Sequence, residues 1–247
     1  MFKLFSTVSA TLLIFAGVAR ADEPQAILDK AIAAHGGEAK INKYPLLTWK
    51  SKGTVHVMGM DIAFTADYVR QYPDKAKTTI DGEVMGQKFN FVQVVRGNKA
   101  WHSFAGNVME LEGEMGDEVQ FQLYTEGLTR VLPLKDKEYT LAPAGEIMVN
   151  DKPAVGIKVS RKNHRDVNLF FDKATGMLVK AQSRGKDPAQ GIEFDQETFV
   201  SDYKDTPAGN RPGKLVIKRD GNVYLEAEYF DFKGSDKPDD SQFDQPK

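Results

Sequence analysis

The chain contains no cysteine among its 247 residues. A disulfide framework is therefore impossible, and the fold must be stabilised by burial of apolar surface, which a chain of this length can achieve unaided. The missing thiol also excludes a nucleophilic cysteine and an N-terminus that is lipid-modified on cysteine. Stability and chemistry must both come from the other side chains.

An excess of positive charge is also missing. The chain has 33 Lys and Arg against 35 Asp and Glu, which gives a formal net charge of −2. Binding of phosphate backbones requires a concentrated positive field. We therefore do not expect nucleic acid as a partner.

Long apolar runs are absent except at the N-terminus. There Lys3 precedes a mostly apolar stretch, residues 4–18, and residues 19–21 read Ala-Arg-Ala, a small-x-small cleavage site. The stretch is shorter than the roughly 20 residues that a membrane-spanning helix needs. The pattern predicts a signal peptide over residues 1–21 and no transmembrane span in the remainder.

Cleavage near Ala21-Asp22 is expected to release a soluble protein into the periplasm or out of the cell. No linker separates two cores in residues 22–247. We therefore expect a single domain, followed by a polar tail from about residue 234 in which Phe243 is the one apolar anchor.

Catalytic motifs are missing too. The sequence has no G-x-S-x-G or H-E-x-x-H motif and no glycine-rich phosphate loop. An acidic group lacks the order of a calcium loop and is typical of a solvated surface. We expect no enzyme activity, no cofactor and no metal site. The four histidines lie far apart in the sequence and none has metal-ligand spacing: His35, His56, His102 and His164. The acidic group is Glu110, Glu112, Glu114, Asp117 and Glu118.

Two segments have helical spacing. The first begins at Pro24 and ends at Gly36-Gly37, with His35 in a capping position. The second runs over residues 114–132 before Pro133, and Gly127 is a weak point in it. Its apolar residues form two stripes, which predicts contacts on both sides of the helix. One stripe is Phe121, Tyr124, Leu128, Val131 and Leu132, and the other is Val119 and Leu123.

The rest of the chain alternates with a period of two, which is typical of half-buried strands. Turn signals separate roughly ten to eleven short strands, above the usual size of a sheet. We therefore predict a mainly β (α+β) fold with one wide, curved antiparallel sheet whose concave face is covered by the two helices.

Three segments of the back half carry a family resemblance. They are "LFFDKATGMLVK", "SDYKDTPAGNRPGKLVIKRDGN" and "DDSQFDQP". They resemble LolA-like proteins, the outer-membrane lipoprotein-sorting type, which have a D-x-x-x-G turn between two strands, a "DY" strand, a G-x-x-x-P turn and a final strand pair. The matching positions are Asp172, Gly176, Asp202, Tyr203, Gly209 and Pro212.

The resemblance implies a half-open β-barrel closed by helices, and carriage of an apolar ligand such as an acyl chain or a lipoprotein. It also implies outer-membrane or export-pathway proteins as partners. We expect the apolar hollow to be lined by aromatic and aliphatic side chains that can bury methylene groups. These are Trp49, Phe64, Tyr68, Phe89, Phe91, Trp101, Phe121, Tyr124 and Leu128.

The family's basic residue just before the proline that ends the second strand is replaced here. Tyr72 precedes Pro73, and Arg70 lies two residues earlier in the same phase. Arg70 and Tyr72 are therefore the candidates for a polar latch between sheet and helix. The alternative hypothesis is a secreted structural or protein-interaction module without catalytic activity, whose hollow is filled by its own helices.

Overall fold

The computed structural model describes residues 23–188 and 190–246. The predicted signal peptide, residues 1–21, lies outside this range. The described helices are α1 (Pro24–Ala34), α2 (Glu38–Ile41) and α3 (Gly113–Leu128), with short 3-10 turns η1 (Leu132–Lys135) and η2 (Asp240–Phe243). None of the described helices is both long enough and apolar enough to cross a membrane.

Fifteen strands are described, more than the ten to eleven predicted. The additional ones include β6, β12 and β13, which have only three or four residues and so are too short to show an alternating pattern. The strands are β1 (Leu46–Val57), β2 (Met60–Gln71), β3 (Lys75–Val84), β4 (Gln87–Arg96), β5 (Lys99–Phe104), β6 (Asn107–Glu110), β7 (Tyr139–Val149), β8 (Lys152–Arg161), β9 (Val167–Asp172), β10 (Leu178–Asp187), β11 (Ile192–Ser201), β12 (Lys204–Thr206), β13 (Gly209–Arg211), β14 (Lys214–Arg219) and β15 (Asn222–Ser235).

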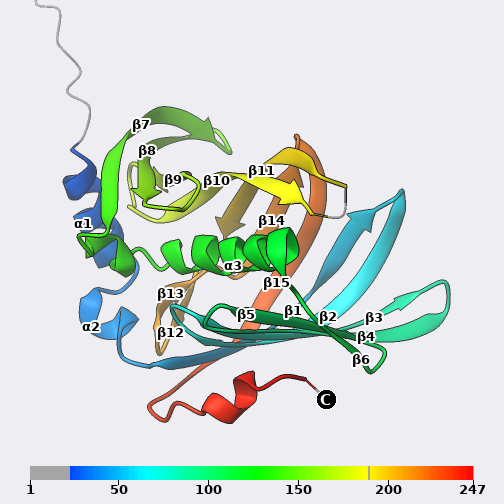
Figure 1. Ribbon diagram of the computed structural model, residues 1–247. Coiled ribbons are helices and arrows are strands. Elements are labelled where there is room, and N and C mark those ends of the chain that lie inside the picture. The colour runs from blue at the N-terminus through cyan, green and yellow to red at the C-terminus, as the bar shows by residue number, and fades with distance from the viewer. Residues whose placement is uncertain (1–22, 189, 247) are drawn as a thin grey trace, which may run out of the picture.

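Thirteen of the strands form one antiparallel sheet (Figure 1). Their order is β6-β5-β4-β3-β2-β1-β15-β14-β11-β10-β9-β8-β7, and β12 pairs only with β13. Pairing of β1 with β15 joins the two halves of the chain in the middle of the sheet. The edge strands β6 and β7 do not pair with each other, so the sheet is not closed into a barrel. The predicted fold class is confirmed.

The turns follow local sequence chemistry. Asn150 and Asp151, at the turn between β7 and β8, have φ of 49° and 60°, as the tight turns of two-residue hairpins require. In the hairpin between β9 and β10, the Asp172 side chain accepts hydrogen bonds from the backbone N–H and the hydroxyl of Thr175, and Gly176 has φ of 77°. That glycine lies against α1, where an added Cβ would meet the Lys30 carbonyl oxygen at 3.1 Å.

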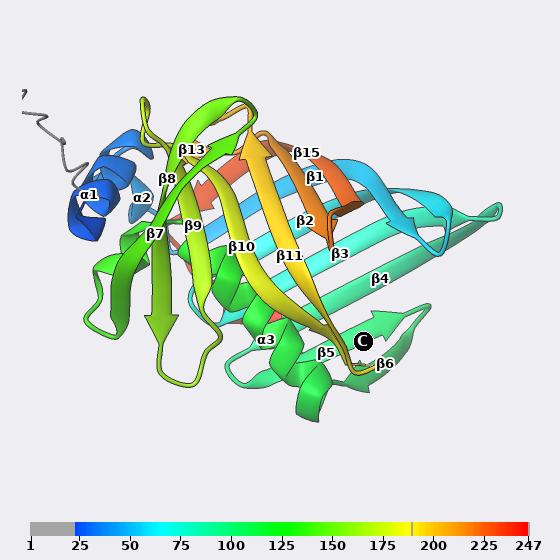
Figure 2. The ribbon, with the colours of Figure 1, turned by 90° about the horizontal axis from the view of Figure 1, so that it is seen from above.

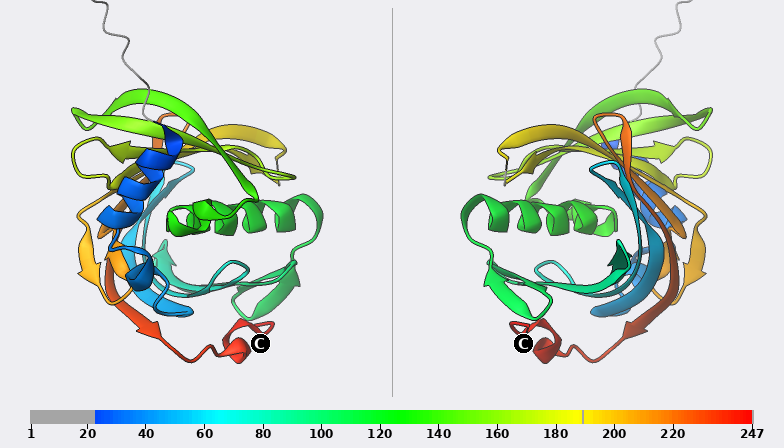
Figure 3. Two further views of the ribbon diagram at one scale, coloured as in Figure 1. Left: turned by 90° about the vertical axis from the view of Figure 1, so that its left-hand side faces the viewer. Right: turned by 90° about the vertical axis from the view of Figure 1, so that its right-hand side faces the viewer.

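The sheet curls around α3, which lies in the hollow (Figure 3). α1 packs across β7 and β8 at one end of the hollow (Figure 2), and its Ile27, Leu28, Ala31 and Ile32 are buried. α3 ends at Leu128, four residues before the predicted end, because the chain turns at Val131, where φ is 59°. Both helices predicted to cover the concave face are therefore present.

The C-terminal segment lies on the outer face of the sheet. Phe243, in η2, is fully buried against Leu46, Val94 and Trp101. The apolar residue predicted to anchor the tail thus fills an outer cluster, on the side of the sheet away from α3.

Candidate functional site

A cavity of about 440 Å³ lies between α3 and the concave face of the sheet. The strand registers decide which side chains face it. Trp49 of β1 is opposite Tyr68 of β2, Tyr68 is opposite Thr78 of β3, and Thr78 is opposite Gln93 of β4. Because side chains alternate between the faces of a strand, these positions share the concave face.

The two apolar stripes of α3 contact different parts of the sheet. Phe121 and Leu128 belong to a large cluster with α1, β8, β9 and β10. Val119 and Leu123, on the opposite side of the helix, pack against β3, β4 and β5. The predicted two-sided packing of this helix is confirmed, and α3 bridges the two arms of the curved sheet.

Arg70 joins β2 to α3. Its Nε and Nη2 donate to the two carboxylate oxygens of Glu126 at 3.0 and 3.1 Å, and Nη1 donates to the carbonyls of Val69 and Lys77 at 3.1 and 2.8 Å. Nη2 also donates to the Thr78 hydroxyl at 3.1 Å. Arg70 is 5% exposed, so its charge depends on this carboxylate for compensation.

Tyr72 completes the contact by donating its hydroxyl to Glu126. Burial alone raises the pKa of Glu126, but the charge and the hydrogen bonds of Arg70 outweigh burial, and the pKa is lowered overall. Burial raises the pKa of Tyr72, which therefore stays protonated and able to donate. We call Arg70, Tyr72 and Glu126 the latch. Both predicted latch residues contact α3, whereas their partner Glu126 was not predicted.

Several residues predicted to line the hollow have the expected position. Trp49, Phe91 and Phe121 line the cavity itself. Phe64 and Tyr68 lie on the same face in adjoining clusters, and Tyr68 stacks on Trp49 with ring centroids 5.1 Å apart. That these side chains bind a ligand remains a prediction.

Phe89 also lies on the concave face, but it packs over Gly82 and beside Phe104, away from α3. Phe104 is half-exposed, so this part of the face is open. Phe89 therefore extends the apolar surface beyond the cavity.

Trp101 does not line the hollow, and that expectation is wrong. The two-residue turn between β4 and β5 sets Trp101 opposite Val94, which is out of phase with Phe89 and Phe91. Trp101 therefore lies on the outer face against Phe243. The position of Trp101 could have been predicted from the sequence, because the length of the turn between β4 and β5 fixes which residues of the two strands lie opposite each other.

Two further predicted residues lie outside the cavity. Leu128 is 1% exposed within the large cluster and forms core rather than cavity wall. Tyr124 faces a groove on the other side of α3, where its ring lies 4.2 Å from that of His164 and 6.4 Å from that of Tyr139. Residues on different sides of α3 thus face the core, the cavity or the groove.

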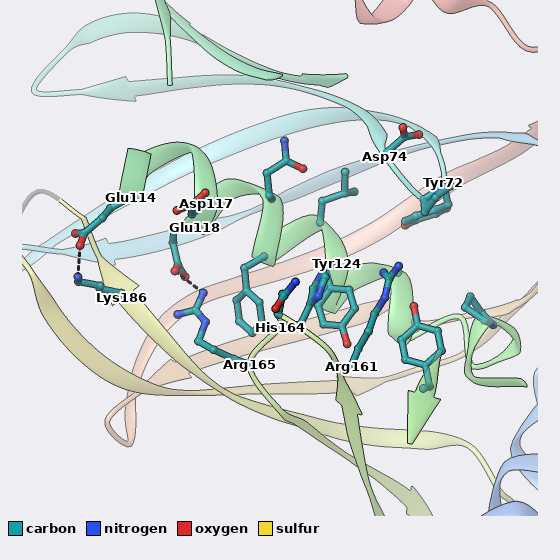
Figure 4. Close-up of a pocket in the computed structure, with 18 residues that line it drawn as sticks. Tyr72, Asp74, Glu114, Asp117, Glu118, Tyr124, Arg161, His164, Arg165 and Lys186 are labelled. Atoms are coloured by element: carbon teal, nitrogen blue, oxygen red, sulfur yellow. Dashed lines mark hydrogen bonds and ion pairs between the residues drawn. The ribbon is translucent and has the colours of Figure 1, made fainter. Parts of the chain in front are cut away.

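The groove has a volume of about 690 Å³, and charged side chains lie beside aromatic ones along it (Figure 4). Glu118 pairs with Arg165 and Glu114 pairs with Lys186, each at 2.6 Å. These members of the acidic group are therefore bound to cations from the β8–β9 connection and from β10. Within the described residues, no cluster of three or more His, Asp or Glu side chains is placed to hold a metal ion.

The cavity is less apolar than predicted. Its polar lining includes Thr78, Gln93 and Ser183, together with two arginines, Arg211 and Arg219. His35, predicted only as a cap, does cap α1, with Nδ1 2.7 Å from the Ala31 carbonyl, but its ring also lines the cavity. The sequence did not indicate that these residues line the cavity, because isolated polar residues in strands usually face solvent.

The two ends of the hollow differ. α1 and the β12–β13 hairpin close one end, which we call the inner end, and Asn210 donates hydrogen bonds there to the carbonyls of Ala34 and His35. The other end, which we call the mouth, lies at the turns that follow β1, β3, β5, β10 and β14. These turns carry exposed apolar side chains: Met58, Met60, Met85, Phe104, Met109, Ile192 and Val223.

No protein-family model matches the sequence, and no curated protein matches it. Solved structures do match. A LolA superfamily protein from Nitrosomonas europaea has a TM-score of 0.59 at 12% identity, over 91% of this chain and 99% of that chain. A DUF1329 family protein from Desulfovibrio piger has a TM-score of 0.60 at 11% identity, over 91% and 98%.

A third match is a domain from Vibrio parahaemolyticus described as an outer membrane lipoprotein-sorting protein. Its TM-score is 0.56 at 11% identity, over 90% of this chain and 97% of that chain. The resemblance to LolA-like proteins is therefore confirmed as a similarity of fold.

Proposed function

We propose that this chain is an exported binding protein or carrier, without catalytic activity, that holds an acyl chain or another apolar ligand between α3 and the curved sheet. It acts after removal of residues 1–21, in the periplasm or outside the cell. The observation that carries the proposal is the cavity under α3, which has aromatic walls on both the sheet and the helix.

The volume of the cavity supports this function. Pockets for small ligands are typically about 300–1,000 Å³, so 440 Å³ is within that range. Each methylene group buried there contributes about 0.8 kcal/mol of transfer free energy. Trp49, Phe91 and Phe121 supply rigid apolar surface for such contacts.

The latch offers a way to admit a ligand. On one side α3 is held by a large apolar cluster and, near its start, by the ion pairs of Glu114 and Glu118. On the other side it is held by a smaller apolar cluster and by one carboxylate that contacts Arg70 and Tyr72. An ion pair can exchange its partner for water, whereas buried apolar side chains cannot. Release of Glu126 would widen the cavity while α3 stays attached to the other arm of the sheet.

The fold similarity is consistent with this proposal. One protein that shares the fold is described as lipoprotein-sorting, and the match extends over nine-tenths of the present chain. An acyl chain, alone or on a lipoprotein, is accordingly the first ligand to test. Outer-membrane or export-pathway proteins are the partners to test after it.

Binding can be measured with an environment-sensitive fluorescent fatty acid and the purified, delipidated protein. We expect saturable binding at micromolar concentrations or below. Competing fatty acids should bind more tightly as their chain is lengthened, until the cavity is full. No saturable binding, or competition that does not depend on chain length, would contradict the carrier and leave the alternative of a structural or protein-interaction module.

A pair of variants separates cavity binding from adsorption to the surface. Phe91→Asp introduces a charge into the cavity wall and should abolish uptake. Phe230→Asp is the control, because Phe230 is 43% exposed and lies on β15 opposite Lys50, on the outer face. Circular dichroism establishes that both variants are folded. Equal loss of binding in the two would place the ligand outside the hollow.

A further inference from the structure

The inner end of the hollow contains a cation without a partner. Arg211 lines the cavity, and its guanidinium lies 5.8 Å from the centre of the Trp49 ring. Within the described residues it makes no hydrogen bond and no ion pair. Arg70 nearby is compensated by Glu126, which it contacts through both carboxylate oxygens. The charge of Arg211 also acts on Glu126, but this one carboxylate faces both arginines, so the inner end keeps an excess of positive charge.

Two buried polar atoms line the same cavity and also lack a partner in the described chain. Trp49 Nε1 and His35 Nε2 belong to side chains that are 6% and 5% exposed. Polar groups this deeply buried normally have a hydrogen-bond partner. Two of them on one wall, beside an unpaired guanidinium, indicate a place prepared for a polar group of a ligand.

The chemistry of these atoms indicates the charge of that group. Trp49 Nε1 can only donate, and Arg211 can only donate. His35 Nδ1 is engaged by the Ala31 carbonyl, so Nε2 donates once the ring is protonated, which a neighbouring anion favours. Burial lowers the pKa of His35, the hydrogen bond to Ala31 raises it, and the charge of Arg211 lowers it. An acceptor with negative charge satisfies Trp49 and Arg211, and it also satisfies His35 when the ring is protonated.

We propose that the inner end of the hollow binds the carboxylate of an amphipathic ligand through Arg211, Trp49 and His35, with the apolar chain of the ligand directed toward the mouth. This inference rests on the proposed function and adds the ligand's headgroup and its orientation. A free fatty acid is the simplest compound of this class.

Arg219 provides an internal comparison. It also lines the cavity and has no carboxylate partner in the described residues, but it lies at the other end, beside the turn that follows β14. Its guanidinium is stacked on Phe194 and Tyr224, at 4.3 and 3.6 Å from the ring centres. Among the described residues that line the cavity, the buried polar atoms without a partner are those of Trp49 and His35, and both lie at the inner end. A headgroup at the mouth would depend on Arg219, and one at the inner end would depend on Arg211.

The test compares dodecanoate with dodecanol, which have the same chain length and differ in the headgroup. Both displace the fluorescent fatty acid if the proposed function holds. We expect the wild-type protein to prefer dodecanoate. Arg211→Gln should weaken dodecanoate binding by roughly tenfold to a hundredfold, the loss expected for a hydrogen bond to a charged group, and leave dodecanol unchanged. Arg219→Gln should change neither by more than about twofold.

A second variant keeps the inference testable if Arg211→Gln does not fold. Trp49→Phe keeps an aromatic ring beside Tyr68 and removes the Nε1–H together with part of the indole surface. The lost surface weakens both compounds alike, so the hydrogen bond is measured by the difference: dodecanoate binding should weaken by roughly fivefold more than dodecanol binding. In a Trp101→Phe protein, Trp49 is the one remaining tryptophan of the chain, and its fluorescence should change with dodecanoate more than with dodecanol.

The results that overturn the inference are distinct from those that overturn the proposed function. Equal affinity of the wild-type protein for acid and alcohol, or loss of the preference in Arg219→Gln instead of Arg211→Gln, would refute the inner carboxylate site and leave the carrier intact. An equal loss for both compounds in Trp49→Phe would also refute it. If neither compound binds, the proposed function itself fails.

Discussion

The two flanks of α3 are built from different interactions. The flank toward β8, β9 and β10 is an apolar core that includes α1, with Leu128 and Val131 almost completely buried. The flank toward β2, β3 and β4 has a smaller apolar cluster and relies on the latch, where Arg70 and Tyr72 contact Glu126. The first flank is therefore apolar around Leu128 and has ion pairs only nearer the start of α3, at Glu114 and Glu118, whereas the second flank has a polar contact close to the end of the helix.

The difference indicates which side of α3 can move. Apolar packing has no partner in water, so separating the first flank exposes surface at about 25 cal/mol per Å². An ion pair and its hydrogen bonds exchange for water at a much smaller net cost, because both groups become hydrated. We infer that α3 is anchored along the β8–β10 flank and opens, if it opens, along the β2–β4 flank.

The largest expected effect is in the apolar flank. Leu128→Ala should lower the free energy of unfolding by about 2–5 kcal/mol, as for other large-to-small changes at fully buried sites. Leu123→Ala, on the opposite flank, should cost less, because Leu123 adjoins both the cavity and the groove, and water can occupy the space. Denaturant titration measures both values. Equal costs would show that the flanks are packed alike.

The next effect concerns the latch. Glu126→Gln keeps a hydrogen-bonding side chain but removes the charge that compensates Arg70, and we expect a loss of about 1–2 kcal/mol. We expect a smaller loss of stability than for a fully buried ion pair, because the Glu126 side chain is 35% exposed. The same substitution should speed uptake of the fluorescent fatty acid in stopped-flow measurements. Slower uptake would argue against opening at this flank.

The latch also predicts a pH dependence. The pKa of Glu126 is lowered in the folded protein, so the carboxylate stabilises the fold at pH values above its ordinary pKa of 4.5. This stabilisation is lost as the pH falls through the lowered value. The difference in stability between wild type and Glu126→Gln should be constant near neutral pH and shrink below about pH 4. A difference that persists at the lowest pH would mean that packing, not charge, holds this contact.

The smallest expected effect is at the pair that spans the groove. Glu114→Gln removes the partner of Lys186; the Glu114 side chain is 62% exposed and that of Lys186 is 31% exposed. Exposed ion pairs contribute about 0–1 kcal/mol. The free energy of unfolding should therefore fall less in Glu114→Gln than in Glu126→Gln. A larger loss from Glu114→Gln than from Glu126→Gln would reverse the assignment of the latch.

Periodicity predicted much of the site. The two stripes of α3 are set by residue spacing, and the structure places them against the two arms of the sheet. Alternation along β1 and β2 placed Trp49, Phe64 and Tyr68 on the concave face. Trp101 was misplaced although the turn length gave its register, since aromatic residues on successive strands were assumed to share a face.

Other features could not be predicted from local pattern. Glu126 is 56 residues from Arg70, and many carboxylates of the chain could have paired with that arginine. Arg211 lies in a three-residue strand whose side-chain direction depends on how the β12–β13 hairpin docks on α1. Leu128 and Tyr124 share a predicted stripe, yet one is core and the other faces the groove, because α3 ends at Leu128 and the chain turns away.

Local patterns predicted the long strands, the tight turns, the cap of α1 and the two-sided character of α3, because each depends on residues that are close together along the chain. The short strands β6, β12 and β13 gave no such pattern. The closing of the hollow was decided only by the tertiary structure. The curl of the sheet brings β2 and β10 to opposite sides of α3, and with them the latch, the unpaired Arg211 and the buried nitrogens of Trp49 and His35. Charges and donors from distant segments acquire partners, or remain without them, only when the arms of the sheet meet around the helix.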